Sequence, residues 1–156
     1  MSVANFPDTQ YFVVLTASGG YQHPIGSFTV TTETELNAIQ LYLTKVGTAT
    51  GTERFRVNLY GNSESVSPID TSDWVGVSEL ENHVNASDWY GYITFDFNRV
   101  GLNTDAQYYL TVECENYASS GDSYYWGVAL DWPENMNTVA VANQAGAAMV
   151  IIGNRE

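Results

Sequence analysis

The sequence alternates apolar and polar residues with a period of two along most of its length, and this pattern most narrowly constrains its fold. Between Leu36 and Val46, the residues Ile39, Leu41 and Leu43 alternate with more polar or smaller ones. Successive side chains of a strand point to opposite faces, so this alternation is typical of antiparallel sheets with one buried and one wet face. The pattern therefore favours strands over amphipathic helices.

Nine segments have this strand character, and turn-forming clusters such as Ser18–Gly20 and Gly61–Ser63 separate them. The expected strands are Tyr11–Thr16, Ser27–Thr32, Leu36–Val46, Phe55–Tyr60, Ile93–Phe97, Tyr108–Cys114, Tyr124–Leu130, Thr138–Val141 and Ala147–Ile152. We predict an all-β fold, an antiparallel β-sandwich (jelly roll) of about nine strands in one domain over residues 1–156.

One long segment, from Glu64 to Asp88, shows no clear strand. Long loops inside compact domains are uncommon and often carry function. Within this segment, Val77–His83 can form one or two helical turns. Carboxylates beside aromatic residues suit a glycosidase, and carboxylate oxygens suit calcium. The acidic residues concerned are Glu64, Asp70, Asp73, Glu79, Glu81 and Asp88, flanked by Trp74 and Trp89.

These carboxylates have a simpler explanation as a solvated acidic face. The chain contains 18 acidic residues, so a group of them in one segment is expected by composition alone. Their spacing matches no calcium-binding loop. We therefore expect no cofactor and no metal, and calcium ligation in the Glu64–Asp88 segment stays open as the alternative.

Histidine and cysteine chemistry is poorly supported by the sequence. The chain has two histidines, His23 and His83, and one cysteine, Cys114, so a three-histidine zinc site is impossible. His23 precedes Pro24 in an expected loop. Alternation places Cys114 on one face with Tyr108, Leu110 and Val112, which predicts a buried structural thiol. No nucleophile, base and orienting group form a recognisable set, and no common catalytic motif occurs, so we expect no catalytic residues and no enzyme.

Charge and hydropathy exclude two classes of partner. Eighteen acidic residues face five basic ones, giving a net charge of −13. Phosphate binding needs clustered cations, so we expect no nucleic-acid partner. The longest apolar stretch, Ala147–Ile152, is too short to span a membrane, so no membrane partner is expected. The residues Met1–Asp8 do not resemble a secretory signal, which predicts synthesis in the cytoplasm without a signal peptide.

The aromatic residues suggest a binding surface. The chain contains 11 tyrosines and 4 tryptophans, and alternation is expected to place Tyr42, Tyr60, Tyr92 and Tyr109 on outward faces. Outward Tyr and Trp suit protein interfaces and stacking on sugar rings, and cross-strand pairing is the alternative explanation. The residues expected at such an interface or glycan-stacking surface are Trp74, Trp89, Tyr92, Tyr109 and Trp126.

The order of strands between Leu36 and Leu130 resembles a known group of proteins. The segments that carry the resemblance are Leu36–Leu43 (LNAIQLYL), Phe55–Tyr60 (FRVNLY), Trp89–Phe97 (WYGYITFDF) and Gln107–Val112 (QYYLTV). They resemble the carbohydrate-binding-module-like jelly-roll modules of tailed-bacteriophage virion proteins, which include capsid decoration proteins and tail-fibre modules. The similarity lies in strand order and not in an invariant motif, so it implies no functional residues.

The resemblance implies a β-sandwich that assembles, often as a homotrimer, on a larger particle. Fibre modules usually belong to longer chains, so a short freestanding sandwich is more similar to a capsid decoration (cement) protein. We therefore expect a non-enzymatic virion structural protein on the particle exterior, with the major capsid protein or another virion protein as its partner. The alternatives are a carbohydrate-binding or host-adhesion module and, last, an enzyme such as a polysaccharide depolymerase built on the acidic segment.

Overall fold

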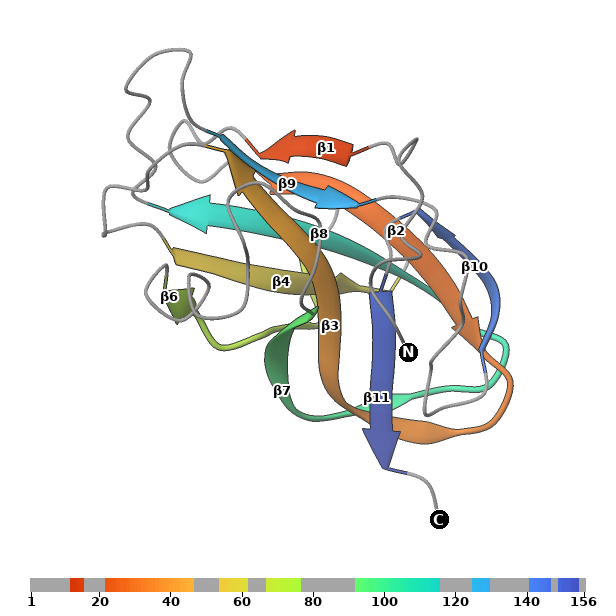
Figure 1. Cartoon of the computed structure of the whole chain (residues 1–156). Helices are drawn as coiled ribbons and strands as arrows, with labels where there is room; N and C mark the ends of the chain where they lie inside the picture. Colours follow the sequence, from red (N-terminus) through yellow and green to blue (C-terminus); the bar gives the residue numbers. More distant parts are fainter. Residues whose placement is uncertain are drawn as a thin grey trace.

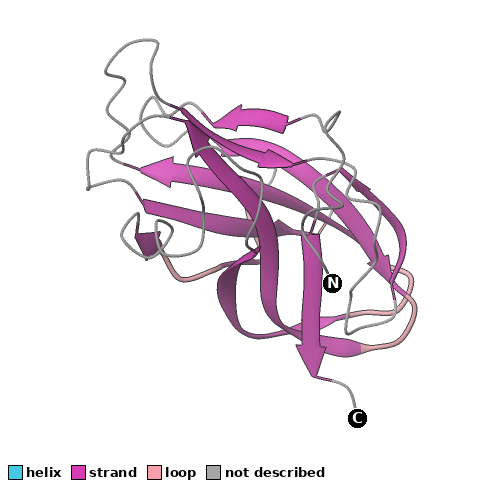
Figure 2. Ribbon diagram, in the orientation of Figure 1, coloured by secondary structure: helices cyan, strands magenta, loops and turns pink. Residues whose placement is uncertain are grey.

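The computed structural model describes residues 12–15, 22–46, 54–61, 67–76, 92–115, 125–129, 141–146 and 149–154. All regular secondary structure in these ranges is β-strand (Figure 2). A search of the same ranges found no helix with the length and apolar character of a membrane span.

Eleven strands are described, and nine of them are four residues or longer. They are β1 (Phe12–Leu15), β2 (Gln22–Val30), β3 (Thr34–Val46), β4 (Arg54–Tyr60), β5 (Asp70–Thr71), β6 (Val75–Gly76), β7 (Tyr92–Leu102), β8 (Gln107–Glu115), β9 (Tyr125–Ala129), β10 (Val141–Gly146) and β11 (Met149–Asn154). Every described pairing between them is antiparallel.

The strands form two sheets. The first, here called the β4 sheet, has the order β10-β2-β8-β4, with β5 and β6 both paired with β4 on the side away from β8. The second, the β3 sheet, has the order β1-β9-β3-β11, and β7 also pairs with β3. In Figure 1, β3 passes in front of β4 and β8 and runs across their direction, with β11 beside it. The predicted antiparallel β-sandwich is confirmed.

The core lies between the two sheets and is filled as the alternation predicts. In β4, Phe55, Val57 and Leu59 are fully buried, while Arg54 and Arg56 between them are only partly buried. Such burial of one face in each sheet supplies most of the stabilisation, about 1.5–3 kcal/mol for each large apolar side chain. The described residues that the β3 sheet contributes to this core are Leu36, Ile39, Leu41, Ile93, Phe95, Phe97, Leu102, Met149 and Ile151. Cys114 is 1% exposed and belongs to this core, which confirms the prediction of a buried thiol.

Strand β2 begins earlier than the sequence predicted. His23 and Pro24, expected in a loop, lie within β2, so that expectation was wrong. The pairing of β2 with β8 shifts register between Pro24 and Gly26. Proline cannot donate to a sheet ladder and is tolerated at such irregularities, which is why it does not end this strand. The described part of β10 runs from Val141 to Gly146 and so extends beyond the expected segment Thr138–Val141, of which residues 138–140 lie outside the described part.

The segment Glu64–Asp88 contains two strands, so the expectation of no strand there was wrong. β5 and β6 are two residues each, too short for alternation to reveal them. We call the described residues Ser67–Gly76 the strap. The suggested helical turn at Val77–His83 lies outside the described residues.

The strap joins the edges of the two sheets. On one side, the Ile69 amide donates to the Leu59 carbonyl of β4 at 2.7 Å. On the other side, the Asp73 amide donates to the Asp96 carbonyl of β7 at 2.9 Å. Val75, which follows in β6, is 6% exposed and packs into the core. The strap therefore closes one side of the sandwich.

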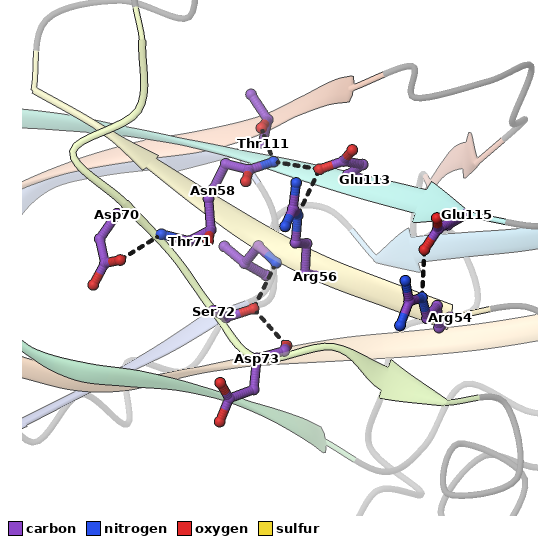
Figure 3. A network of polar contacts seen from close by, with 11 residues as sticks. Arg54, Arg56, Asn58, Asp70, Thr71, Ser72, Asp73, Thr111, Glu113 and Glu115 are labelled. Carbon is purple, nitrogen blue, oxygen red and sulfur yellow. Dashed lines mark hydrogen bonds and ion pairs between the residues drawn. The ribbon is translucent and has the colours of Figure 1, made fainter.

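Ser72 completes the strap where the ladder is interrupted between β5 and β6. Its amide donates to the Val57 carbonyl at 2.8 Å, and its hydroxyl accepts from the Val57 amide at 2.9 Å. The same hydroxyl donates to the Asp73 carbonyl at 2.9 Å (Figure 3). The Ser72 side chain thus accepts the hydrogen bond of the Val57 amide, which a backbone carbonyl would accept in a continuous strand.

We expect Ser72→Ala to lower the free energy of unfolding by about 1–2 kcal/mol, because it leaves the Val57 amide without its acceptor at a buried position. Chemical denaturation monitored by tryptophan fluorescence measures the change. Ser67→Ala, in the same strap at an exposed position, is the matched control and should change stability by less than about 0.5 kcal/mol. Equal effects of the two substitutions would contradict the assigned role of Ser72.

Candidate functional site

The outer face of the β4 sheet carries a cluster of paired polar side chains. In the register of β4 against β8, Arg54 lies opposite Glu115, and Arg56 lies opposite Glu113. Directly opposed charges of opposite sign stabilise an antiparallel pair. We call the following residues the outer-face cluster: Arg54, Arg56, Asn58, Trp74, Thr111, Glu113 and Glu115.

Within the cluster, burial increases along β4 from Arg54 towards Asn58. The Arg54 Nε–Glu115 Oε2 ion pair is the more open one, with side chains 44% and 41% exposed. Arg56 Nε donates to Glu113 Oε1 at 2.7 Å, and these side chains are 29% and 13% exposed. The second pair is therefore less screened by water and ions than the first.

Asn58 connects the inner ion pair to the buried end of the cluster. Its Nδ2 atom lies 3.3 Å from Thr111 Oγ1 and 3.3 Å from Glu113 Oε1 (Figure 3). Asn58 is 1% exposed and Thr111 is fully buried. Burying a polar group is costly unless it is hydrogen-bonded. These contacts therefore allow Asn58 and Thr111 to be buried on the outer face of the sheet.

Trp74 of the strap packs against both arginines. The guanidinium carbon of Arg54 and that of Arg56 each lie 4.4 Å from the centroid of the indole ring. Cation–π contacts of this kind contribute about 0.5–2 kcal/mol each, depending on solvent exposure. The half-buried ring is thus held against β4 by two cations, each of which is also bonded to a glutamate.

The cluster still offers free hydrogen-bonding atoms. Among the described residues, the Nη atoms of Arg54 and Arg56 have no hydrogen-bond acceptor, and each arginine uses only its Nε atom. Each of the two glutamates likewise has one carboxylate oxygen that makes no hydrogen bond within the described part of the chain. Donors and acceptors therefore lie beside an aromatic ring, a combination that can bind a polar partner.

The five aromatic residues predicted from the sequence do not form one surface. Trp74 belongs to the cluster. Tyr109 is half-buried on the same sheet but lies opposite Tyr60, four residues or about 13 Å along β4 from Arg56. Tyr92 and Trp126 lie in β7 and β9 of the β3 sheet, where only their backbones are described. Trp89 lies outside the described residues.

Tyr60 is not exposed, which corrects the expectation of an outward, solvent-facing ring. Alternation places it on the outer face with Arg56 and Asn58, yet it is only 2% exposed. The direction of a side chain follows from strand geometry, whereas its exposure depends on what covers that face. At this end of the outer face, Asn58 and Thr111 are buried as well. The side chains of Tyr42 and Tyr92 are not described.

The acidic segment shows no metal-ligand geometry in its described part. Asp70 Oδ1 accepts from the Thr71 amide at 2.8 Å, and Asp73 is exposed. Within the described ranges, no group of three or more His, Cys, Asp or Glu side chains could hold a metal ion. The other members of the segment lie outside these ranges: Glu64, Glu79, Glu81, Asp88 and His83.

The arginines and glutamates of the cluster were not predicted as site residues. Part of their signal was present, since Arg56 lies in the predicted strand Phe55–Tyr60 and Glu113 lies in the predicted strand Tyr108–Cys114. Arg54 directly precedes the first of these strands, and Glu115 directly follows the second. Only the strand register reveals that these two charged rows face each other.

Fold and site together define a class of protein, an antiparallel β-sandwich with a paired polar and aromatic outer face. Comparison with protein-family models, with curated proteins and with solved structures found no match in any of the three.

Proposed function

We propose that this chain is a non-enzymatic virion structural protein, a capsid decoration protein that binds the outer capsid surface as a homotrimer and stabilises it. The observation that carries the proposal is the outer-face cluster, in which the charged side chains bond one another. Catalytic groups instead converge on a position that a reacting atom can occupy. A rigid sandwich whose polar side chains pair across strands suits binding by shape and charge.

The charge distribution supports a partner with a basic surface. The chain carries a net charge of −13. Each arginine with a described ion pair bonds a glutamate, in the pairs Arg54–Glu115, Arg56–Glu113 and Arg99–Glu35. The acidic excess therefore remains uncompensated. Such a field attracts lysine- and arginine-rich protein surfaces and repels packaged nucleic acid.

The proposal predicts that the purified chain is a trimer and co-sediments with capsids of the encoding virus that were assembled without it. Light scattering coupled to size-exclusion chromatography measures the first property, and ultracentrifugation measures the second. Because the attraction is largely electrostatic, binding should weaken as salt is raised from about 0.05 to 0.5 M. A monomer that stays in the supernatant at low salt would refute the proposal.

Glycan binding is the second candidate function, and one observation favours it. Trp74 lies beside Nη donors and carboxylate oxygens that make no hydrogen bond to the described residues, and such groups suit the hydroxyl groups of a sugar. Its ring already contacts two guanidinium groups, and this occupancy makes the candidate weaker than the first. A glycan array probed with the wild-type chain separates the two functions. Specific glycan binding by the wild-type chain would favour an adhesion module over a decoration protein.

A further inference from the structure

Two long strands would have open edges if the strap were absent. β4 pairs with β8 on one side, and among the described strands only the strap residues pair with its other side. β7 pairs with β3 alone within the described part of the chain. Both are rich in β-forming residues, and unpaired edges of this kind are templates for pairing with another chain.

The strap lies along the β4 edge and contacts the β7 edge at one point. β6 lies beside Arg54 and Phe55, the two bonds of Ser72 serve Val57, and β5 lies beside Asn58 and Leu59. The single bond from Asp73 to the Asp96 carbonyl reaches the β7 edge. The strap therefore forms hydrogen bonds with the backbone groups on the outer edge of β4. At its centre, the hydroxyl of Ser72 replaces a backbone carbonyl as the acceptor for the Val57 amide.

The strap is itself a poor template for further pairing. β5 and β6 are two residues each, Pro68 is exposed, and the strap contains the charged residues Asp70 and Asp73. Short strands, proline and charge are the features that prevent edge-to-edge association. The strap therefore covers the adhesive edge of β4 with an edge that is unsuited to further pairing.

Trp74 holds the strap to β4 through two side-chain contacts. It lies between β5 and β6 in the chain, and its ring contacts Arg54 and Arg56. Both arginines are fixed in turn by Glu115 and Glu113 on β8. The ring thus links the strap to two strands of the sheet through side chains alone.

We propose that the strap is a releasable edge guard and that Trp74 is its latch. When the latch is lost, the strap opens locally and exposes the β4 edge, which then pairs with the same edge of a second copy of this chain. This device is independent of the proposed function, because the capsid experiment uses the wild-type chain with its latch intact.

Native-state hydrogen exchange of Trp74→Ala tests the proposal. Exchange of the Ile69, Ser72 and Asp73 amides should accelerate about tenfold or more, because the contacts of the ring are lost. Amides in the β2–β8 and β3–β11 ladders should keep their wild-type rates. On concentration, the variant should form species larger than the wild-type one, as measured by light scattering.

Tyr109→Ala is the matched control, since it removes a half-buried aromatic ring from the same sheet but not from the strap. It should leave the hydrogen exchange of the strap amides unchanged, and light scattering should give the same molecular mass as for the wild-type protein. Trp74→Phe keeps a ring and should show a smaller acceleration than Trp74→Ala. The proposal is overturned if hydrogen exchange of the strap amides is unchanged in Trp74→Ala or accelerates equally in all strands. It is also overturned if the strap amides exchange faster but light scattering detects no larger species.

Discussion

Phe95→Ala is expected to lower the free energy of unfolding by about 3–5 kcal/mol, the largest effect of any single substitution considered for this chain. Phe95 is fully buried in β7 and lies opposite Ile39, which is also fully buried. The substitution removes the free energy gained by transferring the phenyl ring from water into the core. It also leaves a cavity that the two sheets cannot readily close, because hydrogen bonds between their strands keep each sheet rigid. Urea denaturation, monitored by circular dichroism, measures the loss.

Thr94→Ala, at the neighbouring residue of the same strand, is the control for this substitution. Thr94 is exposed, and its hydroxyl accepts from Gln40 Nε2 at 3.0 Å. Exposed bonds of this kind contribute little, so we expect a change of less than about 0.5 kcal/mol. If both substitutions cost the same, the assignment of Phe95 to the inward face of β7 is wrong.

Glu113→Ala is expected to have the second largest effect, a loss of about 2–3 kcal/mol. Its Oε1 atom accepts from both Arg56 Nε and Asn58 Nδ2. Removing the carboxylate leaves a partly buried guanidinium without its counter-charge and a buried amide with one bond fewer. Arg56 retains some contact with water, which keeps the loss below that of a fully buried ion pair. Thermal and urea unfolding measure it.

Glu115→Ala makes the same chemical change two residues away in the same strand. The Arg54–Glu115 pair is exposed on both sides, so its loss should cost at most about 1 kcal/mol and should shrink further at high salt. The effect of Glu113→Ala should change less with salt, because its pair is more buried. Similar losses for the two variants at all salt concentrations would refute the burial gradient along the cluster.

Much of the fold could be predicted from the sequence because alternation is a local signal. The apolar face of β4, with Phe55, Val57 and Leu59, and the buried thiol of Cys114 both follow from side chains that point to opposite faces in turn. The failures have equally local causes. β5 and β6 are too short to alternate, and Pro24 suggests a turn although an irregular strand tolerates it.

The candidate site could be predicted only in part. Trp74 was singled out for its residue type, but its neighbours Arg54 and Arg56 were not, because they lie in another strand. The exposure of Tyr60 was predicted from direction alone and was wrong. Coverage of an outer face depends on segments that are distant in sequence, which alternation cannot report.

The sequence by itself determined most of the longer strands, which of their faces is apolar and how acidic the molecule is, since each of these depends on neighbouring residues or on composition. The tertiary structure decided the register that sets Arg56 against Glu113 and the course of the strap that brings Trp74 to β4. Pairing between strands is a non-local choice, fixed by the joint packing of two sheets and by backbone hydrogen bonds at their edges. A charged row on one strand therefore acquires its partner, and an aromatic residue its contacts, only in the folded chain.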